Sequence, residues 1–422
     1  MKLLTDITPL REIPAFRRLW IGSMLSGVGG AMTNFAMSLQ VWDITHSTAA
    51  VGGLGVATLV PMLVIGLPGG TLADRVDRRK LVLVVTAGQT AVSGLLFAQA
   101  FVDLRSLWLL YALEAAASAG GALSQPARQT FIRALVPQQQ LAAAMAVNRI
   151  IFQSMMIAGP ALAGVVAAAF GVKGCFLLDA VSFAGSFYGV GRLPAMRPPK
   201  TANAKPERRG LALTGEGLSY IWRNRVLAGT FLADLNATFF GLPLALFPAI
   251  NAQRFGGDPR ILGLFTTAIG VGGMVTAVFS GPLRHMPRQG VAMLVTVSTW
   301  GVAFAVFAVA PWLWLTLLAL GVAGAADSFT VVIRGVIVQT VTPDEFRGRV
   351  NAADWVVGAG GGQLGSLESG LLASVTSPEV SALAGGLLTI AGAVAIGATL
   401  PAFRGYRERR EAAEPARPAA SG

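Results

Sequence analysis

The chain has 422 residues, of which 54% are hydrophobic and only 13% are charged. Soluble globular domains carry about 25% charged residues, so this composition excludes an ordinary soluble protein. The formal net charge of +12 does not indicate a nucleic-acid partner, because the basic residues are confined to short segments between long apolar stretches. Cys175 is the only cysteine, which excludes an intramolecular disulfide and a cysteine-rich metal site, and no cofactor is expected.

Apolar stretches of roughly 20 residues recur along the chain, which is the length a helix needs to cross a bilayer core about 30 Å thick. The first stretch is too long for the apolar region of a signal peptide and lacks a clear cleavage site, so we expect it to be retained. The sequence therefore predicts an all-α polytopic membrane protein with about twelve transmembrane helices. The predicted spans are 19–41, 50–72, 81–101, 106–127, 141–169, 175–193, 226–249, 261–283, 290–310, 312–333, 350–373 and 380–402.

The basic residues predict the orientation in the membrane, because cytoplasmic loops retain Lys and Arg. Counting from an inner amino terminus, the inner segments hold 27 of the 33 basic residues. The opposite loops hold only Arg105, Lys173, Arg254 and Arg260. We therefore expect a multi-pass protein of the inner cell membrane with both termini in the cytoplasm, surrounded by the lipid bilayer and monomeric.

One connection is much longer than the others and divides the chain into two halves. We predict an N-terminal six-helix bundle at 1–193, a cytoplasmic middle loop at 194–225, a C-terminal six-helix bundle at 226–403 and a cytoplasmic tail at 404–422. The second part of the middle loop, LALTGEGLSYIWRNR, has a helix-like pattern.

The segment GLPGGTLADRVDRRKLVLVV, which starts at Gly66, joins the second and third spans. It resembles the cytoplasmic signature loop of the major facilitator superfamily. A carboxylate at Asp74 could face the positive end of a helix dipole and pair with an arginine. The resemblance implies a conformational latch, with an arginine at the inner end of the fourth span as relay partner; alternatively, the basic residues only enforce topology. The expected latch residues are Gly69, Asp74, Arg75, Asp77, Arg78, Arg79, Arg128 and Arg133.

The fifth span contains MMIAGPALAG, which starts at Met155 and resembles the Gly-Pro element in the fifth helix of exporters of this superfamily. Pro160 removes a backbone donor and bends the helix, while Gly159 and Gly164 allow a neighbouring helix to approach closely. Such a seam could restrict leakage during transport. Ordinary helix packing is the alternative interpretation.

Residues 127–164 match residues 333–370 without a gap, at an offset of 206. The two segments occupy the same place in the predicted topology of each half. The repeat predicts two pseudo-symmetric halves related along the membrane normal. Identical pairs include Arg128 with Arg334, Pro137 with Pro343, Gly159 with Gly365, and Gly164 with Gly370.

Three further segments, PAFRRLWIG from Pro14, THSTAAVGGLGVA from Thr45 and VIVQTVTPDEFRGRVNA from Val336, extend the resemblance over nearly the whole chain. They are similar to the twelve-span siderophore and drug exporters of the major facilitator superfamily. The resemblance implies a secondary active transporter, driven by the proton gradient, that exports a siderophore of the enterobactin type or a hydrophobic drug or macrolide by alternating access. An importer with the same fold and a transporter-like sensor remain alternatives.

Other classes of function lack their sequence signals. The chain has no Gly-rich phosphate loop ending in Gly-Lys-Ser/Thr, so an ATP-driven pump within this chain is excluded. Neither His46 nor His285 belongs to a metal or nucleophile constellation, so we expect neither an enzyme nor a metal site.

Ionisable residues inside spans are costly, at about 2.5–3.5 kcal/mol each on insertion scales, and tend to face cavities. Glu114 and Asp234 are the first candidates for proton coupling because no basic residue lies near them in sequence, although polar packing is the alternative for each. Asp327 lies seven residues before Arg334 on the same helical face, so these two either form a structural network or include a proton carrier. Glu368 completes the candidates. Arg149, Asp179 and Asp354 are the remaining ionisable residues in spans.

Many proton antiporters of the superfamily carry an arginine inside the fourth span, and this chain has Glu114 there instead. Its route of proton coupling therefore departs from the family pattern. Asn34, Gln40, Asn236 and Phe239 lie in spans that usually line the central cavity, so they are candidate substrate contacts. For Phe239, the alternative to a substrate contact is a position that faces lipid or packs in the protein core.

Overall fold

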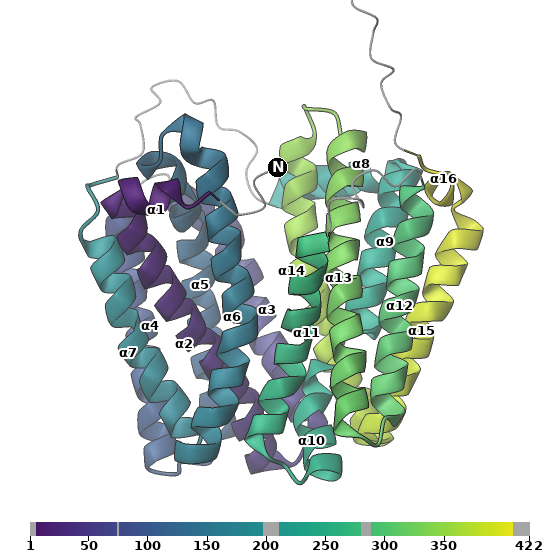
Figure 1. Cartoon of the computed structure of the whole chain (residues 1–422), viewed down its shortest axis with the longest axis horizontal. Coiled ribbons are helices and arrows are strands. Elements are labelled where there is room, and N and C mark those ends of the chain that lie inside the picture. The colour runs from purple at the N-terminus through teal and green to yellow at the C-terminus, as the bar shows by residue number, and fades with distance from the viewer. Residues whose placement is uncertain (1–5, 74–75, 197–210, 280–287, 408–422) are drawn as a thin grey trace, which may run out of the picture.

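The computed structural model describes residues 6–73, 76–196, 211–279 and 288–407, and within these ranges the chain is helical and contains no strand. Figure 1 shows the helices standing side by side as two bundles. The first bundle, here called the N-half, contains α2 (Pro14–Thr45), α3 (Thr48–Ala73), α4 (Arg78–Phe101), α5 (Leu107–Leu135), α6 (Leu141–Phe170) and α7 (Val172–Gly191). The second bundle, the C-half, contains α9 (Arg225–Phe240), α10 (Phe247–Phe255), α11 (Pro259–Phe279), α12 (Gln289–Val309), α13 (Leu313–Val341), α14 (Arg347–Val375) and α15 (Pro378–Thr399).

Five short elements complete the described chain: α1 (Thr8–Glu12), η1 (Gln138–Gln140), α8 (Leu211–Arg223), η2 (Leu244–Leu246) and α16 (Pro401–Arg404). Three of them, α1, α8 and α16, lie at the same end of the bundles (Figure 1), which we call the terminal face. The other end, where α10 lies, is called the opposite face. The helix α8 falls in the predicted middle loop and packs against α9 and α14 of the C-half.

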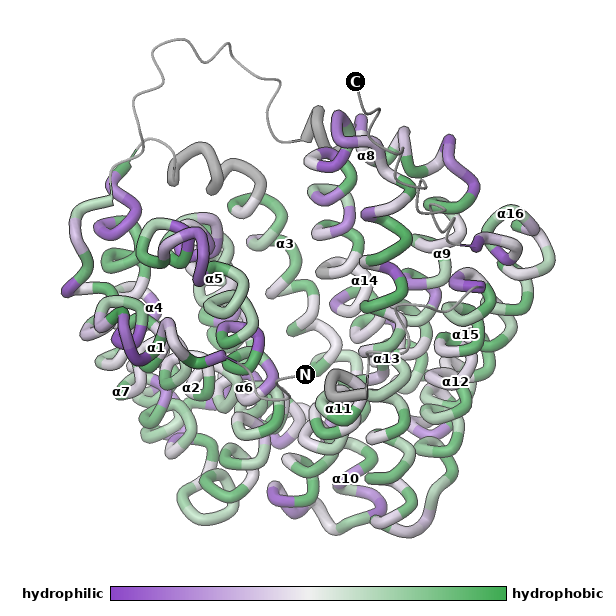
Figure 2. Tube along the Cα trace, turned by 45° about the horizontal axis from the view of Figure 1, so that its top comes forward, coloured by the Kyte–Doolittle hydropathy of each residue, from purple (hydrophilic) through white to green (hydrophobic). Residues whose placement is uncertain are grey.

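Every predicted span except 226–249 corresponds to one long helix at the expected place. Ten helical stretches in the described ranges are long and apolar enough to cross a membrane. The helices α2 and α14, with 32 and 29 residues, are long enough but richer in Gly and polar residues. Figure 2 shows apolar residues along most of both bundles. Large apolar side chains such as Val64, Val84, Val181 and Val394 are exposed, as a lipid environment allows.

The predicted span 226–249 is broken in the structure. The helix α9 ends at Phe240, and the chain continues through Gly241 and Pro243 into η2 and α10. Pro243 has no N–H to extend the helix. The carbonyl oxygen of Gly241, just after α9, accepts a hydrogen bond from the indole of Trp300 at 2.7 Å. A single unbroken helix over 226–249 was therefore wrong in detail.

The 206-residue repeat makes equivalent contacts in space. A Cβ at Gly159 would collide with Ala31 of α2, and a Cβ at Gly365 would collide with the backbone of Thr238 in α9, so each of these glycines packs inside its own half. Gly164 instead packs against α11, and its equivalent Gly370 packs against α3. One pair of equivalent glycines therefore packs within the two halves, and the other pair packs between them.

The two halves meet along two helix pairs, α3 with α14 and α6 with α11. A Cβ at Gly164 would lie 2.6 Å from the carbonyl oxygen of Pro259, and a Cβ at Gly52 would lie 2.6 Å from that of Ser366. Only glycine permits such close approach of two helices. We call these two contacts the glycine seams, and both lie in the part of the molecule toward the opposite face.

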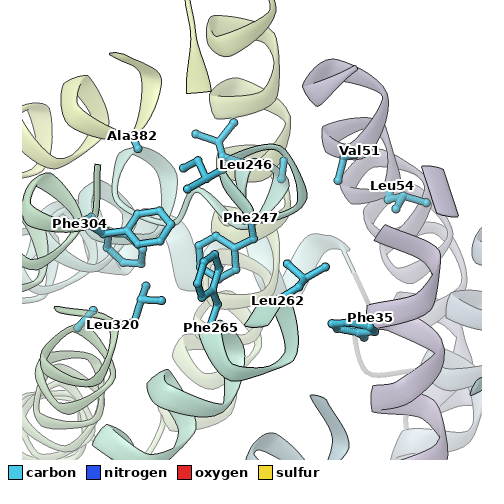
Figure 3. Packing of buried hydrophobic residues seen from close by; sticks show 14 of the residues in the cluster. Phe35, Val51, Leu54, Leu246, Phe247, Leu262, Phe265, Phe304, Leu320 and Ala382 are labelled. Carbon is cyan, nitrogen blue, oxygen red and sulfur yellow. The ribbon is translucent and has the colours of Figure 1, made fainter. Parts of the chain in front are cut away.

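An apolar cluster accompanies the seams. It contains residues of both halves, including Phe35 and Leu54 from the N-half and Phe247, Leu262 and Phe265 from the C-half. Figure 3 shows these side chains converging from helices of the two halves. The halves are therefore held together by packing toward the opposite face.

Candidate transport site

A cavity of about 990 Å³ lies in the N-half, toward the terminal face. Cavities of about 300–1,000 Å³ are typical of small-molecule sites. Its lining comes from α2, α4, α5, α6 and α7, and includes the aromatic residues Phe16, Trp20, Phe152 and Phe183, the amides Gln89, Gln125, Gln129 and Asn148, and two cations, Arg128 and Arg133. No carboxylate is among the lining residues in the part of the chain that the structure describes.

Arg128 lines this cavity rather than extending to a carboxylate. One terminal nitrogen of its guanidinium donates to Thr86 of α4 and Ser186 of α7, both at 3.3 Å. Within the described ranges it forms no ion pair. Arg133, at the end of α5, also lines the cavity. The two arginines that were expected to serve the latch thus give the cavity a positive charge.

Asp179 of α7 is a buried carboxylate that the sequence analysis did not select. The residue is 2% exposed. One oxygen, Oδ2, accepts hydrogen bonds from Thr33 at 2.8 Å and Ser93 at 2.6 Å, while Oδ1 has no partner among the described atoms. The available signal was an acid inside an apolar span, but nothing in the sequence ranked it above Glu114.

The guanidinium of Arg128, which is in α5, and the carboxylate of Asp179 both bond to residues where α4 packs against α7. These helices run in opposite directions, so Thr86 is level with Ser186, and Ser93 is level with Asp179. The two levels are seven residues apart on both helices, which is about 10 Å along a helix axis. A cation at the cavity and a buried acid therefore lie about two turns apart.

Glu114 of α5 lies between α5 and α3. It is 9% exposed, and its Oε1 accepts a hydrogen bond from the Thr58 hydroxyl at 2.7 Å. No cation pairs with it among the described side chains. Glu114 thus resembles Asp179 in being a buried acid supported only by hydroxyl groups.

The acids of the C-half are arranged differently. Arg334 of α13 bridges Asp234 of α9 at 2.6 Å and Asp354 of α14 at 3.2 Å. Asp327 lies close enough to interact electrostatically with Asp234 and Arg334. Asp234 therefore has a cationic partner that its sequence neighbours did not reveal, and Arg334 pairs with acids on other helices rather than with Asp327.

The four candidate substrate contacts lie outside the lining of the 990 Å³ cavity. Gln40 exchanges two hydrogen bonds with Gln99, at 3.1 and 2.9 Å, and Asn236 donates to the carbonyl oxygen of Thr389 at 2.8 Å. Asn34 is exposed.

Phe239, the fourth of these candidates, lines a shallow apolar groove beside α14 together with Glu368. The groove has a volume of about 620 Å³. Glu368 is thus set apart from the other acids, and both residues remain candidates by prediction alone.

The signature loop joins two helices of the N-half. Asp77 caps α4, accepting from the backbone N–H of Arg79 at 2.9 Å, and also accepts from that of Met196 at 3.3 Å. The Arg79 guanidinium donates to the carbonyl oxygen of Gly191 at the end of α7. The backbone N–H of Arg78 donates to the carbonyl oxygen of Met196. Gly69 lies in α3.

Asp74 and Arg75 lie outside the described residues, so their part in the expected latch stays a prediction. In the exporter-type element, Pro160 and Gly164 both contact α11, where the carbonyl oxygen of Pro160 lies 2.5 Å from the place of a Cβ on Gly263. The element therefore forms one of the glycine seams.

Two similar halves of six spans each, with α9 and α10 together forming one span, are the architecture of a major facilitator transporter. The chain belongs to the transmembrane secretion effector family, which it matches over residues 4–417. The enterobactin exporter EntS of Citrobacter koseri is 28% identical over 409 residues, covering 96% of this chain and 95% of that protein. EntS of Escherichia coli O81 is 26% identical over 408 residues, covering 96% of each.

Solved transporter structures share the fold. The nucleoside transporter NupG superposes with a TM-score of 0.72 at 14% identity, covering 91% of this chain and 98% of that chain. A bacterial homologue of the human lysosomal transporter Spinster, inward-facing and occupied, gives 0.69 at 14% identity, covering 94% and 98%. The predicted fold class and the membership of the exporter branch are thus confirmed, and the relatives are transporters rather than enzymes.

Proposed function

We propose that this protein is a secondary active exporter of a small molecule in the inner membrane, working by alternating access and driven by the proton gradient. The observation that carries the proposal is the cavity toward the terminal face, combined with the glycine seams toward the opposite face. The similarity to proteins named as enterobactin exporters supports export, and a siderophore of the enterobactin type as cargo. A hydrophobic drug is the second candidate cargo.

If the terminal face is cytoplasmic, as the basic residues predict, the cavity admits cargo from the cytoplasm. Release on the other side then requires the seams to part. The described hydrogen bonds across them run from side chains to backbone: Thr48 to Gly370 and Gln153 to Gly270, each at 2.8 Å, and Thr267 to Ile157 at 3.2 Å. Such bonds break without leaving an unpaired buried charge, which suits an interface that opens in each cycle.

Proton coupling requires an acid that gains and loses a proton during the cycle. Glu114 and Asp179 are suited to this role, because each is a buried carboxyl group bonded only to hydroxyls, so protonation breaks no ion pair. Asp234 is less suited, since its proton would have to displace the contact with Arg334. We assign the coupling role to Glu114 and Asp179.

Inverted membrane vesicles with an imposed pH gradient test this function. We expect an enterobactin-type siderophore, or failing that a macrolide or dye, to accumulate in the vesicles and to be released when a protonophore collapses the gradient. Glu114→Gln and Asp179→Asn should each lower gradient-driven accumulation by about tenfold while preserving exchange without a gradient, because the amides keep the shape but carry no exchangeable charge. Vesicles lacking the protein provide the background.

Three outcomes contradict the proposal. Accumulation by right-side-out vesicles instead would make the protein an importer. Absence of any flux would favour a sensor. Unchanged gradient-driven accumulation in both variants would remove Glu114 and Asp179 from the coupling step and leave the transport function itself in place.

A further inference from the structure

The internal repeat gives each half an arginine at the same position, but the two arginines have different partners. Arg334 in the C-half is neutralised by Asp234 and Asp354. Arg128 in the N-half has only the hydroxyls of Thr86 and Ser186, at the long distance of 3.3 Å. One half therefore balances its buried charge and the other does not.

The repeat also identifies the residues responsible for this difference. At the offset of 206, the counterpart of Asp354 is Asn148, which lines the same cavity as Arg128. The helix α9, which carries Asp234, corresponds to α2. The only acid of α2 is Asp43, which lies near the C-terminal end of that helix. An amide, and a helix whose only acid lies near its far end, thus occupy the places where the C-half has its two carboxylates.

A half-buried guanidinium without a counter-ion is costly, because part of its hydration is lost without a compensating charge. The cost disappears when an anionic group binds to it. Arginine is well suited to this, since its planar fork of donors matches a carboxylate or phosphate. The surrounding amides and hydroxyls offer hydrogen bonds, and Trp20 and Phe152 offer apolar surface to the rest of a ligand.

We propose that the N-half cavity binds an organic anion, with the acidic group of the ligand on Arg128 and its remaining surface against the amide and aromatic side chains. The proposal rests on the function proposed above and narrows its cargo. It favours acidic compounds over cationic drugs, because no described side chain in the cavity supplies a negative charge.

Two xanthene dyes of similar size and opposite charge serve as probes: carboxyfluorescein, an anion, and rhodamine 123, a cation. Their binding to the purified full-length protein in lipid nanodiscs is measured by fluorescence anisotropy. We expect the anion to bind and the cation to bind at least about tenfold more weakly, since the charge that attracts one repels the other.

The decisive variant is Asn148→Asp, which gives the N-half the counter-ion that the C-half already has. It should weaken carboxyfluorescein binding by about tenfold or more, as should Arg128→Gln, whereas Arg128→Lys should retain part of the binding. Arg192→Gln is the matched control, because Arg192 lies over the ring of Tyr188 and outside the cavity lining. Thermal unfolding shows that each variant is folded.

Rhodamine binding as tight as that of carboxyfluorescein, or unchanged anion binding in Asn148→Asp, overturns the anion site. Failure of the wild-type protein to bind the anion, with gradient-driven flux of a cationic or neutral cargo intact, overturns the site and leaves the exporter. Charge-dependent binding without any flux in vesicles overturns the exporter and leaves the site.

Discussion

At Arg334 a single guanidinium holds together three helices of the C-half. It lies on α13, and its two acidic partners lie on α9 and α14. The side chain of Arg334 is 15% exposed and that of Asp234 only 6%. Removing one partner from such a group leaves the other charges buried and uncompensated.

We therefore expect Arg334→Gln to lower the free energy of unfolding by about 3–5 kcal/mol, because Asp234 and Asp354 lose their common counter-ion. Thermal or denaturant unfolding in detergent measures the change. Adding Asp234→Asn to this variant should restore part of the loss, and the exposed Arg192→Gln should have no effect. An Arg334→Gln protein as stable as the wild type would show that the cluster does not stabilise the C-half.

The sequence located these charges but not their partners. Asp234, Asp327 and Arg334 could be identified as intramembrane ionisable residues from their places in apolar stretches. Their pairing could not, because Asp234 lies 100 residues before Arg334, and the sequence does not determine which way each helix is rotated about its own axis. For the same reason Gln40 was expected at the cavity, although both its amide nitrogen and its amide oxygen bond to Gln99.

At the scale of helices, the glycine seams set how closely α6 and α11 approach. Gly164 and Gly263 face each other, and a Cβ on Gly263 would lie 3.2 Å from the Cα of Gly164. A larger side chain at either position must push the two helices apart. Because these helices belong to different halves, the change also affects how the halves meet.

Gly164→Leu should lower the free energy of unfolding by about 1–3 kcal/mol, as overpacking does in other tightly packed sites. It should also reduce flux, since the seam no longer closes. Gly88→Leu in α4 is the matched control, because open space surrounds Gly88 and a side chain there meets no neighbour. Unfolding curves and vesicle flux are measured for both variants. Equal unfolding free energies and equal flux in Gly164→Leu and Gly88→Leu would argue against a functional seam.

The helices themselves were largely predictable, and the break after α9 was not. Long apolar stretches define membrane helices because their backbone groups must be satisfied internally. Gly241 and Pro243 were visible in the sequence, but such residues also occur in continuous membrane helices. At the break, the carbonyl oxygen of Gly241 accepts a hydrogen bond from Trp300, which is 59 residues away in sequence. No local sequence pattern predicts this contact.

For the whole molecule, the distribution of basic residues predicts that the terminal face is cytoplasmic. Cys175 is fully buried, so a newly introduced cysteine would be the only reactive thiol. Arg105 lies in the turn after α4 at the opposite face, with 68% of its side chain exposed, and Arg192 lies at the end of α7 at the terminal face. These positions report on the two sides of the membrane.

In intact cells, a membrane-impermeant maleimide should label Arg105→Cys and leave Arg192→Cys unlabelled until the membrane is permeabilised. The charge distribution gives the reason, since basic loops are held on the cytoplasmic side. The wild-type chain, with Cys175 alone, is the control for background labelling. The reverse pattern would place the termini outside and reverse the direction of transport inferred from the cavity.

Basic residues are in excess around the terminal face: Arg133 lines the cavity, and Arg17 and Arg18 lie next in sequence to its lining residues Phe16 and Leu19. They give the entrance an excess of positive charge, and with it a positive field. Such a field raises the local concentration of oppositely charged solutes and speeds their encounter with the protein. It reaches only about 8 Å at physiological ionic strength. The residues that are expected to set the orientation of the chain would then also gather acidic cargo from solution. Added salt would slow loading while leaving the later steps of the cycle unchanged.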